Sequence, residues 1–233
     1  CAYPCHRERD EGYLTAEPGM YPDVLEDITE FGFPIISGQW RSLWIEVETS
    51  ETTPAGEYPI EFILESAACA PGMKPLSAKI GVTAEVIDAV LPELNLIHTE
   101  WFHCDCLADY YKTEIFSQRH WRIIENFVRH AVKRGCNMLL TPVFTPPLDT
   151  AKNGERPTVQ LVDVTVTDQG YAFGYDRFER WVDMCRRCNI KYFEISHLFS
   201  QWGAKAAPKI VANVNGEERN IFGWETRASG KEY

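Results

Sequence analysis

Short stretches in residues 1–90 alternate apolar and polar positions with a period of two, which is typical of β-strands with one buried face. One such stretch is SLWIEVETS at 42–50, and a second, TTPAGEYPIEFILES at 52–66, begins with a Pro-Ala-Gly turn. We predict that these two stretches form a β-hairpin. The stretch at 77–92 adds a third alternating run. Short strands separated by turns, with no helical pattern between them, predict an antiparallel β-sandwich.

The pattern changes to helical spacing after Pro92, so we expect two domains, residues 1–91 and 92–233. Residues 117–135 place apolar side chains three or four positions apart, with Ser117 as a helix N-cap and Gly135 just past the end. Residues 176–189 repeat this spacing and predict a second helix.

Three apolar runs flank these helices, at 93–101, 136–144 and 190–199, and each is too short for a helix. The order strand, helix, strand, helix, strand predicts a parallel sheet with helices outside it. Two further hairpins are expected, one around 168–170 and one after the Asn-Gly at 215–216. Three strands cannot close a barrel, so the second domain is either a small open α/β domain or part of a larger one.

Composition narrows the function classes. The formal net charge of -11 disfavours binding to a phosphate backbone, so we expect no nucleic-acid partner. No stretch has the roughly 18 apolar residues that a membrane span needs, and the N-terminus does not have the pattern of a signal peptide. The eight cysteines do not form a dense disulfide framework, which favours buried free thiols and a cytoplasmic location.

Candidate binding residues gather where the predicted parallel strands end, because ligands of α/β folds bind at the carboxyl ends of strands. Tryptophan faces stack on the apolar faces of sugar rings, while carboxylates and imidazoles bind the hydroxyl groups. This mixture of side chains predicts a carbohydrate ligand. The predicted substrate contacts are Trp101, His103 and Asp105 after the first strand, Thr141 after the second, and Glu194, His197 and Trp202 at the third.

The stretch WFHCDC at 101–106 leaves two other interpretations open. Zinc needs three or four nitrogen, sulfur or oxygen ligands, but neighbouring residues of an extended chain point in opposite directions. Cys104 or Cys106 with His197 as base would make a nucleophile. Core packing is the alternative for each tryptophan, and a purely structural partner is the alternative for Glu194. We favour the sugar-binding interpretation and expect no metal and no cofactor.

Four long motifs carry a resemblance to a known family: WFHCDCLADYY, LLTPVFTPPLDTA, ERPTVQLVDV, and YFEISHLFSQWGAKAAPKIV with GWET behind it. Together with LWIEVETSETTPAGEYPIEF, they are similar to the glycoside hydrolase family 123-like proteins, from about residue 20 to the end. The resemblance implies a β-sandwich followed by a (β/α)8 TIM-type barrel. It also implies a retaining β-N-acetylgalactosaminidase in which the sugar's own N-acetyl oxygen attacks the anomeric carbon, an exception to the two-carboxylate scheme.

In that family an aspartate orients the acetamide and the next residue, a glutamate, is the general acid/base. That Asp-Glu pair belongs on a later barrel strand, and no matching stretch occurs here. We therefore expect a fragment that holds the sandwich and the first three barrel strands, with no catalytic residue and no hydrolysis by itself. We also expect self-association through the open barrel edge.

Three classes of function remain open at this point. The first is an enzyme, a glycoside hydrolase acting on N-acetylhexosamine glycans, represented here by its non-catalytic part. The second is a non-catalytic carbohydrate-binding module, which the presence or absence of the Asp-Glu pair would distinguish. The third is a structural or metal-binding protein based on the cysteines, which metal analysis would settle.

Overall fold

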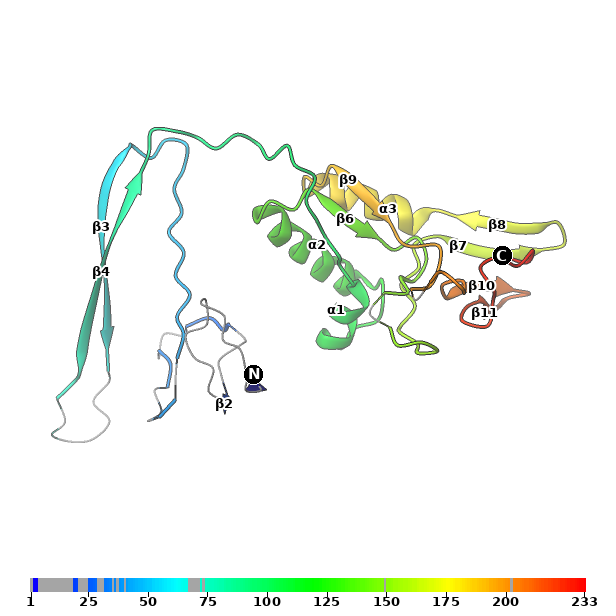
Figure 1. Ribbon diagram of the computed structural model, residues 1–233, viewed down its shortest axis with the longest axis horizontal. Helices are drawn as coiled ribbons and strands as arrows, with labels where there is room; N and C mark the ends of the chain where they lie inside the picture. Colours follow the sequence, from blue (N-terminus) through cyan, green and yellow to red (C-terminus); the bar gives the residue numbers. More distant parts are fainter. Residues whose placement is uncertain are drawn as a thin grey trace. The chain divides into compact units, whose positions relative to one another are not determined.

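The computed structural model describes residues 2–3, 19–20, 25–28, 32–34, 36, 38–39, 41–66, 72, 74–148, 150–201 and 203–233. The chain divides into two units, Cys1–Leu91 and Pro92–Tyr233. It is a mixed α/β protein with several small sheets and few helices (Figure 1).

The first unit contains two antiparallel pairs of strands. β1 (Ala2–Tyr3) pairs with β2 (Gly19–Met20), and β3 (Gly56–Glu65) pairs with β4 (Ser77–Val86) over ten residues. The hairpin predicted between 42–50 and 52–66 is therefore wrong, because 41–50 contains no strand and 56–65 pairs with the following run instead. Alternation indicated which residues favour an extended chain, but it did not identify the partner.

The second unit contains the predicted βαβαβ arrangement. β5 (Thr99–Glu100), β6 (Met138–Thr141) and β9 (Tyr192–Ile195) form a parallel sheet in the order β5-β6-β9. α2 (Gln118–Lys133) and α3 (Asp176–Arg187) connect these strands, as the sequence predicts. Ser117 caps α2 by accepting a hydrogen bond from the backbone N–H of His120 at 3.2 Å.

The main core lies between α2, α3 and one face of this sheet. Its buried side chains include Trp121 and Ile124 from α2, Trp181 and Met184 from α3, and Leu139 from β6. Burial of these large apolar groups is the main stabilising contribution to the unit. The predicted helical stripes are confirmed, since the side chains that pack inward recur at the expected three- and four-residue spacing.

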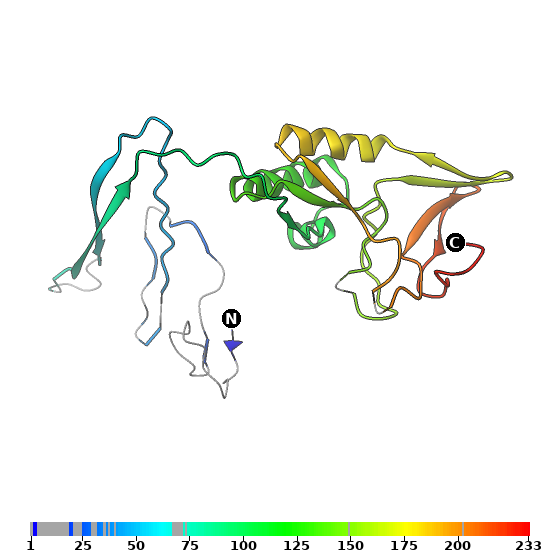
Figure 2. The ribbon, with the colours of Figure 1, turned by 45° about the horizontal axis from the view of Figure 1, so that its top comes forward.

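A second sheet of the same unit has the order β11-β10-β7-β8. β7 (Asp163–Thr167) and β8 (Gly170–Gly174) form the predicted hairpin, and Figure 2 shows β8 leading into α3. β10 (Ile210–Val214) and β11 (Glu217–Phe222) form the other hairpin, with β10 parallel to β7. The sequence did not predict that the two hairpins share one sheet.

One helix was also not predicted. α1 (Cys104–Tyr111) begins inside the WFHCDC stretch, which the sequence interpretation treated as extended. The described residues show neither a closed barrel nor a sandwich, so both remain predictions for the larger protein.

Candidate functional site

Glu194 lies on β9, on the face of the parallel sheet that turns away from the main core. Its neighbour Phe193 packs into that core, and alternation along a strand places Glu194 on the opposite face. There Thr99 Oγ1 donates a hydrogen bond to Glu194 Oε2 at 3.1 Å, and Trp101 Nε1 donates to Oε1 at 3.2 Å. The two donors come from β5 and the residues that follow it, so β5 and β9 together orient one carboxylate.

His197 completes this group just beyond the end of β9. Its ring meets the Trp101 indole edge to face, with centroids 5.7 Å apart and an angle of 81° between the planes. His197 is exposed and Trp101 is 50% exposed. We call Thr99, Trp101, Glu194 and His197 the Glu194 cluster. Three of the seven predicted substrate contacts are thus brought together at one sheet edge.

The Glu194 cluster can accept and donate hydrogen bonds beside an aromatic surface. A carboxylate has about four lone-pair sites, and two donors leave the others available to a ligand's hydroxyl groups. Glu100 is not part of this arrangement, because alternation turns it to the other side, where His98 Nε2 lies 3.1 Å from its Oε1. The cluster therefore offers a single carboxylate, which suits binding and orientation of a polar ligand.

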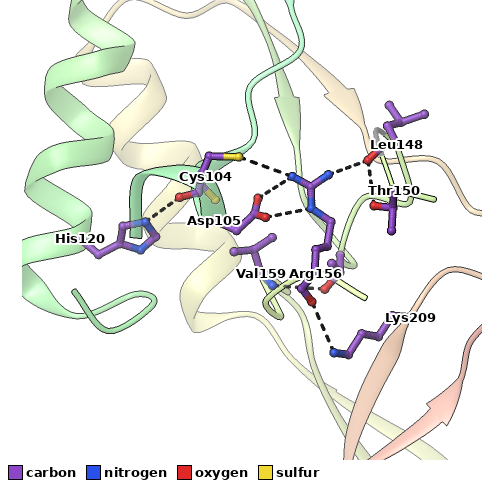
Figure 3. A network of polar contacts seen from close by, with 10 residues as sticks. Cys104, Asp105, His120, Leu148, Thr150, Arg156, Val159 and Lys209 are labelled. Atoms are coloured by element: carbon purple, nitrogen blue, oxygen red, sulfur yellow. Dashed lines mark hydrogen bonds and ion pairs between the residues drawn. The ribbon is translucent and has the colours of Figure 1, made fainter. Parts of the chain in front are cut away.

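Asp105 is placed very differently, in the first turn of α1 and 3% exposed. Arg156 donates two hydrogen bonds to the Asp105 carboxylate, from Nε at 2.9 Å and from Nη2 at 3.1 Å (Figure 3). The third arm of the same guanidinium donates to the carbonyl oxygen of Leu148 at 2.6 Å. Such a bidentate buried pair holds the segment after β6 against α1, so Asp105 is a structural residue and its oxygens are occupied.

The structure places two further predicted contacts, Thr141 and His103, elsewhere. Thr141 is fully buried at the end of β6, and alternation points it to the opposite face from Glu194. His103 is half-buried and precedes α1 as its N-cap residue. Trp202 lies outside the described residues.

The surroundings of Cys104 do not support a nucleophile. Burial, together with the adjacent negative Asp105, strongly raises the pKa of the Cys104 thiol, so the thiol stays protonated. His120 Nε2 bonds the backbone oxygen of Cys104 at 2.9 Å rather than the thiol, and burial lowers the pKa of His120 (Figure 3). Burial likewise raises the pKa of Cys185 to about 12.

Five cysteines within the described ranges are free thiols, and Cys106 is the exposed one. Among the residues that the structure describes, no group of three or more His, Cys, Asp or Glu side chains is arranged to hold a metal ion. The WFHCDC stretch is instead the junction at which the chain leaves β5 and enters α1. Its acidic residue holds Arg156, and Cys104 is part of the core.

Sequence reasoning did not find a cavity of about 380 Å³ formed by three loop segments. These segments are the stretch after β6, the residues just before β10, and the end of β11 with the loop behind it. The side chains that give this cavity its chemistry are Pro146, Asn153, Glu155, Lys209, Trp224 and Glu225. A signal was present in the GWET motif, whose tryptophan and glutamate both line the cavity, and the motifs at 139–151, 155–164 and 192–211 contribute further lining residues.

A larger hollow of about 760 Å³ lies beside β7 and β10, but it has no aromatic lining. Arg177 on its wall is already ion-paired with Asp163. We assign this hollow no ligand.

The chain can be compared with known proteins. No curated protein matches the sequence. The fold is similar to the solved structure of a family 123 glycoside hydrolase from Clostridium perfringens, with a TM-score of 0.53 and 17% sequence identity. The similarity covers 73% of this chain and 30% of that one, so this chain spans under a third of the length of its structural relative. None of the helices in the described part of the chain has the length and apolar character needed to cross a membrane.

The model of the glycoside hydrolase 123 catalytic domain matches residues 101–233, which is more than half of the chain. The matched region contains Trp101, Glu194 and His197 of the Glu194 cluster and all the segments that form the cavity. With this match and the shared fold, the chain belongs to glycoside hydrolase family 123.

Proposed function

We propose that the protein is a glycoside hydrolase acting on N-acetylhexosaminides, of the retaining, substrate-assisted β-N-acetylgalactosaminidase type, and that this chain forms part of its substrate-binding wall. Family membership supports the class of reaction. The structural relative from Clostridium perfringens is described as hydrolysing the glycans of glycolipids, which supports glycan as the substrate class.

The observation that carries the proposal is the fixed carboxylate of Glu194. Two donors, Thr99 on β5 and Trp101 just after it, hold it at the carboxyl end of the sheet, beside a half-exposed indole and an exposed imidazole. Carboxylate and imidazole bind sugar hydroxyl groups, and the indole face covers the apolar side of the ring. A carboxylate held in this way orients the substrate without taking part in bond cleavage.

The same placement supports a barrel as the architecture of the larger protein. In a (β/α)8 barrel the helices cover the outer face of the parallel strands, and substrate residues stand at the carboxyl ends. Here α2 and α3 cover the face of Leu139 and Phe193, while Glu194 occupies the other face. We propose that β5, β6 and β9 are three strands of such a barrel, preceded by a β-sandwich.

Hydrolysis of 4-nitrophenyl N-acetyl-β-D-galactosaminide by the full-length protein tests the reaction. We expect release of nitrophenol, with the β-anomer of N-acetylgalactosamine appearing first in a proton NMR time course. Replacing Trp101→Ala should raise KM by about tenfold, because an aromatic anchor at a binding site is worth more than about 1 kcal/mol. Trp44→Ala is the matched control, since Trp44 is an exposed tryptophan of the first unit.

Glycan binding without cleavage is the second candidate, because the Glu194 cluster contains one carboxylate whereas most glycosidases use two. Binding of N-acetylgalactosamine, with no product formed from the aryl glycoside, would favour this candidate. If the protein neither binds N-acetylgalactosamine nor cleaves the aryl glycoside, both candidate functions are rejected.

A further inference from the structure

The cavity between the loops is the feature of this unit that the Glu194 cluster leaves unexplained. Its volume of about 380 Å³ falls within the range of about 300–1,000 Å³ that is usual for small-molecule sites. Thr145 comes soon after β6, and Lys209 comes at the end of the segment that follows β9. The cavity is therefore formed in part by the segments that follow β6 and β9, and His197 lies near the start of the second of these segments.

The walls of this cavity are held in place by hydrogen bonds. Arg156 is anchored to Asp105 and to the carbonyl oxygen of Leu148. The carboxamide of Gln201 donates to the oxygen of Thr150 at 2.9 Å, and the Trp224 indole N–H donates to the oxygen of Gly154 at 2.8 Å. A cavity held in this way needs little ordering when a ligand enters, which favours affinity.

The charges on the walls point to a neutral ligand. The positive charge of Arg156 is neutralised by buried Asp105, which leaves Lys209 against two carboxylates, those of Glu155 and Glu225. Lys209 Nζ lies 3.4 Å from Glu155 Oε2, a long contact at which a hydroxyl group can compete. An anionic ligand would meet excess negative charge, whereas hydroxyl groups would find both donors and acceptors.

The apolar part of the lining offers surfaces on which a sugar ring can pack. Because the Trp224 N–H is already bonded to Gly154, the indole offers its ring surface to the cavity, and Pro146 adds a second apolar surface. Aromatic surface beside alternating donors and acceptors matches a pyranose, which has C–H groups on its faces and hydroxyl groups around its edge.

The geometry points to a second sugar subsite in this cavity, which binds a neutral sugar unit of the glycan whose terminal residue occupies the Glu194 cluster. This inference rests on the proposed function, because it assigns to the same substrate a further point of attachment. Trp224 is the platform, and Glu225 and Lys209 take the hydroxyl groups.

Two probes separate the subsites: N-acetylgalactosamine alone, and a neutral tetrasaccharide with a terminal β-linked N-acetylgalactosamine. Because the proposed enzyme cleaves the tetrasaccharide, its binding is measured as KM from initial rates of N-acetylgalactosamine release, and that of the monosaccharide as an inhibition constant, both with the full-length protein. Titration calorimetry replaces both measurements if no cleavage occurs. Trp224→Ala should weaken tetrasaccharide binding at least about thirtyfold and leave the monosaccharide within about twofold. Glu225 is exposed, and Glu225→Gln preserves the shape of its side chain; this variant should bind the tetrasaccharide about tenfold more weakly. Trp44→Ala serves as the matched control.

A second measurement observes the unmodified protein and uses a conservative variant only to assign one signal. In nitrogen-15 spectra of the unmodified protein, the indole N–H signal that disappears in Trp224→Phe belongs to Trp224. This signal should shift on saturation with the tetrasaccharide and stay in place with the monosaccharide.

The possible outcomes distinguish the two proposals. One outcome is that both probes bind, the Trp224 signal does not shift, and the Trp224→Ala variant binds the tetrasaccharide as well as the unmodified protein does. This outcome overturns the second subsite and leaves the proposed function standing. Equal losses for both probes in Trp224→Ala would mean one continuous site and would also overturn it. Absence of binding to either probe overturns the proposed function and the subsite together.

Discussion

Asp105 and Glu194 are two acidic residues of the same unit with the same predicted role, and they do opposite things. Asp105 is buried, and both of its carboxylate oxygens accept hydrogen bonds from Arg156, which joins α1 to the loop after β6. Glu194 is half-buried and held by two neutral donors, with its remaining lone pairs available to a ligand. The comparison teaches that a carboxylate near a strand end acquires its role from the partner that reaches it.

The difference lies in the charge of the partner and in access to solvent. A guanidinium in a buried setting matches a carboxylate completely and cannot be exchanged for a ligand. A hydroxyl and an indole N–H fix the direction of a carboxylate and leave its charge unneutralised. The first arrangement stabilises the fold, and the second is the one on which the proposed binding surface rests.

Asp105→Ala should have the largest effect on stability. Removal of one partner leaves the Arg156 guanidinium buried and uncompensated, which lowers the free energy of unfolding by about 3–5 kcal/mol. Urea unfolding followed by tryptophan fluorescence measures the change. Glu217→Ala is the matched control, because its ion pair with Arg219 is exposed on both sides and should contribute less than about 1 kcal/mol. Equal effects in the two variants would show that Asp105 is not a structural residue.

Glu194→Gln should affect binding where Asp105→Ala affects folding. The amide keeps the shape of the carboxylate but loses its charge, and charge-assisted hydrogen bonds are about twice as strong as neutral ones. We expect N-acetylgalactosamine to bind about ten- to a hundredfold more weakly, with the urea midpoint nearly unchanged. A large loss of stability with normal affinity per folded molecule would place Glu194 beside Asp105 as a structural residue.

The sequence predicted the framework of the second unit well, because its signals are local. Ser117, the helical spacing behind it and Gly135 define α2 from neighbouring residues alone. The pairing of 56–65 with 77–86 was not predicted, since alternation along one strand carries no information about the partner. Helix α1 was missed because WFHCDC has the composition of a strand end and no recognisable cap.

Part of the arrangement at the Glu194 cluster could also be predicted, because it depends on local signals. Trp101, Glu194 and His197 stand at the ends of predicted strands, so parallel pairing alone brings them together. The pairing of Asp105 with Arg156 could not be predicted, because Arg156 is distant in sequence and lies in an irregular segment. The cavity is formed entirely by loops and strand ends, where no periodicity shows which side chains converge.

Thr99→Val is the smallest change and the sharpest test of how Glu194 is held. Valine has the shape of threonine and lacks the hydroxyl that donates to Glu194 Oε2 at 3.1 Å, while Trp101 still holds the other oxygen. A neutral hydrogen bond contributes about 1 kcal/mol, so we expect roughly fivefold weaker binding of N-acetylgalactosamine. The effect should vanish in a Glu194→Gln background if Thr99 acts through the carboxylate, because a double-mutant cycle isolates that coupling. Additive losses would mean that Thr99 contacts the sugar itself, and the Glu194 cluster would then have a second direct ligand on β5.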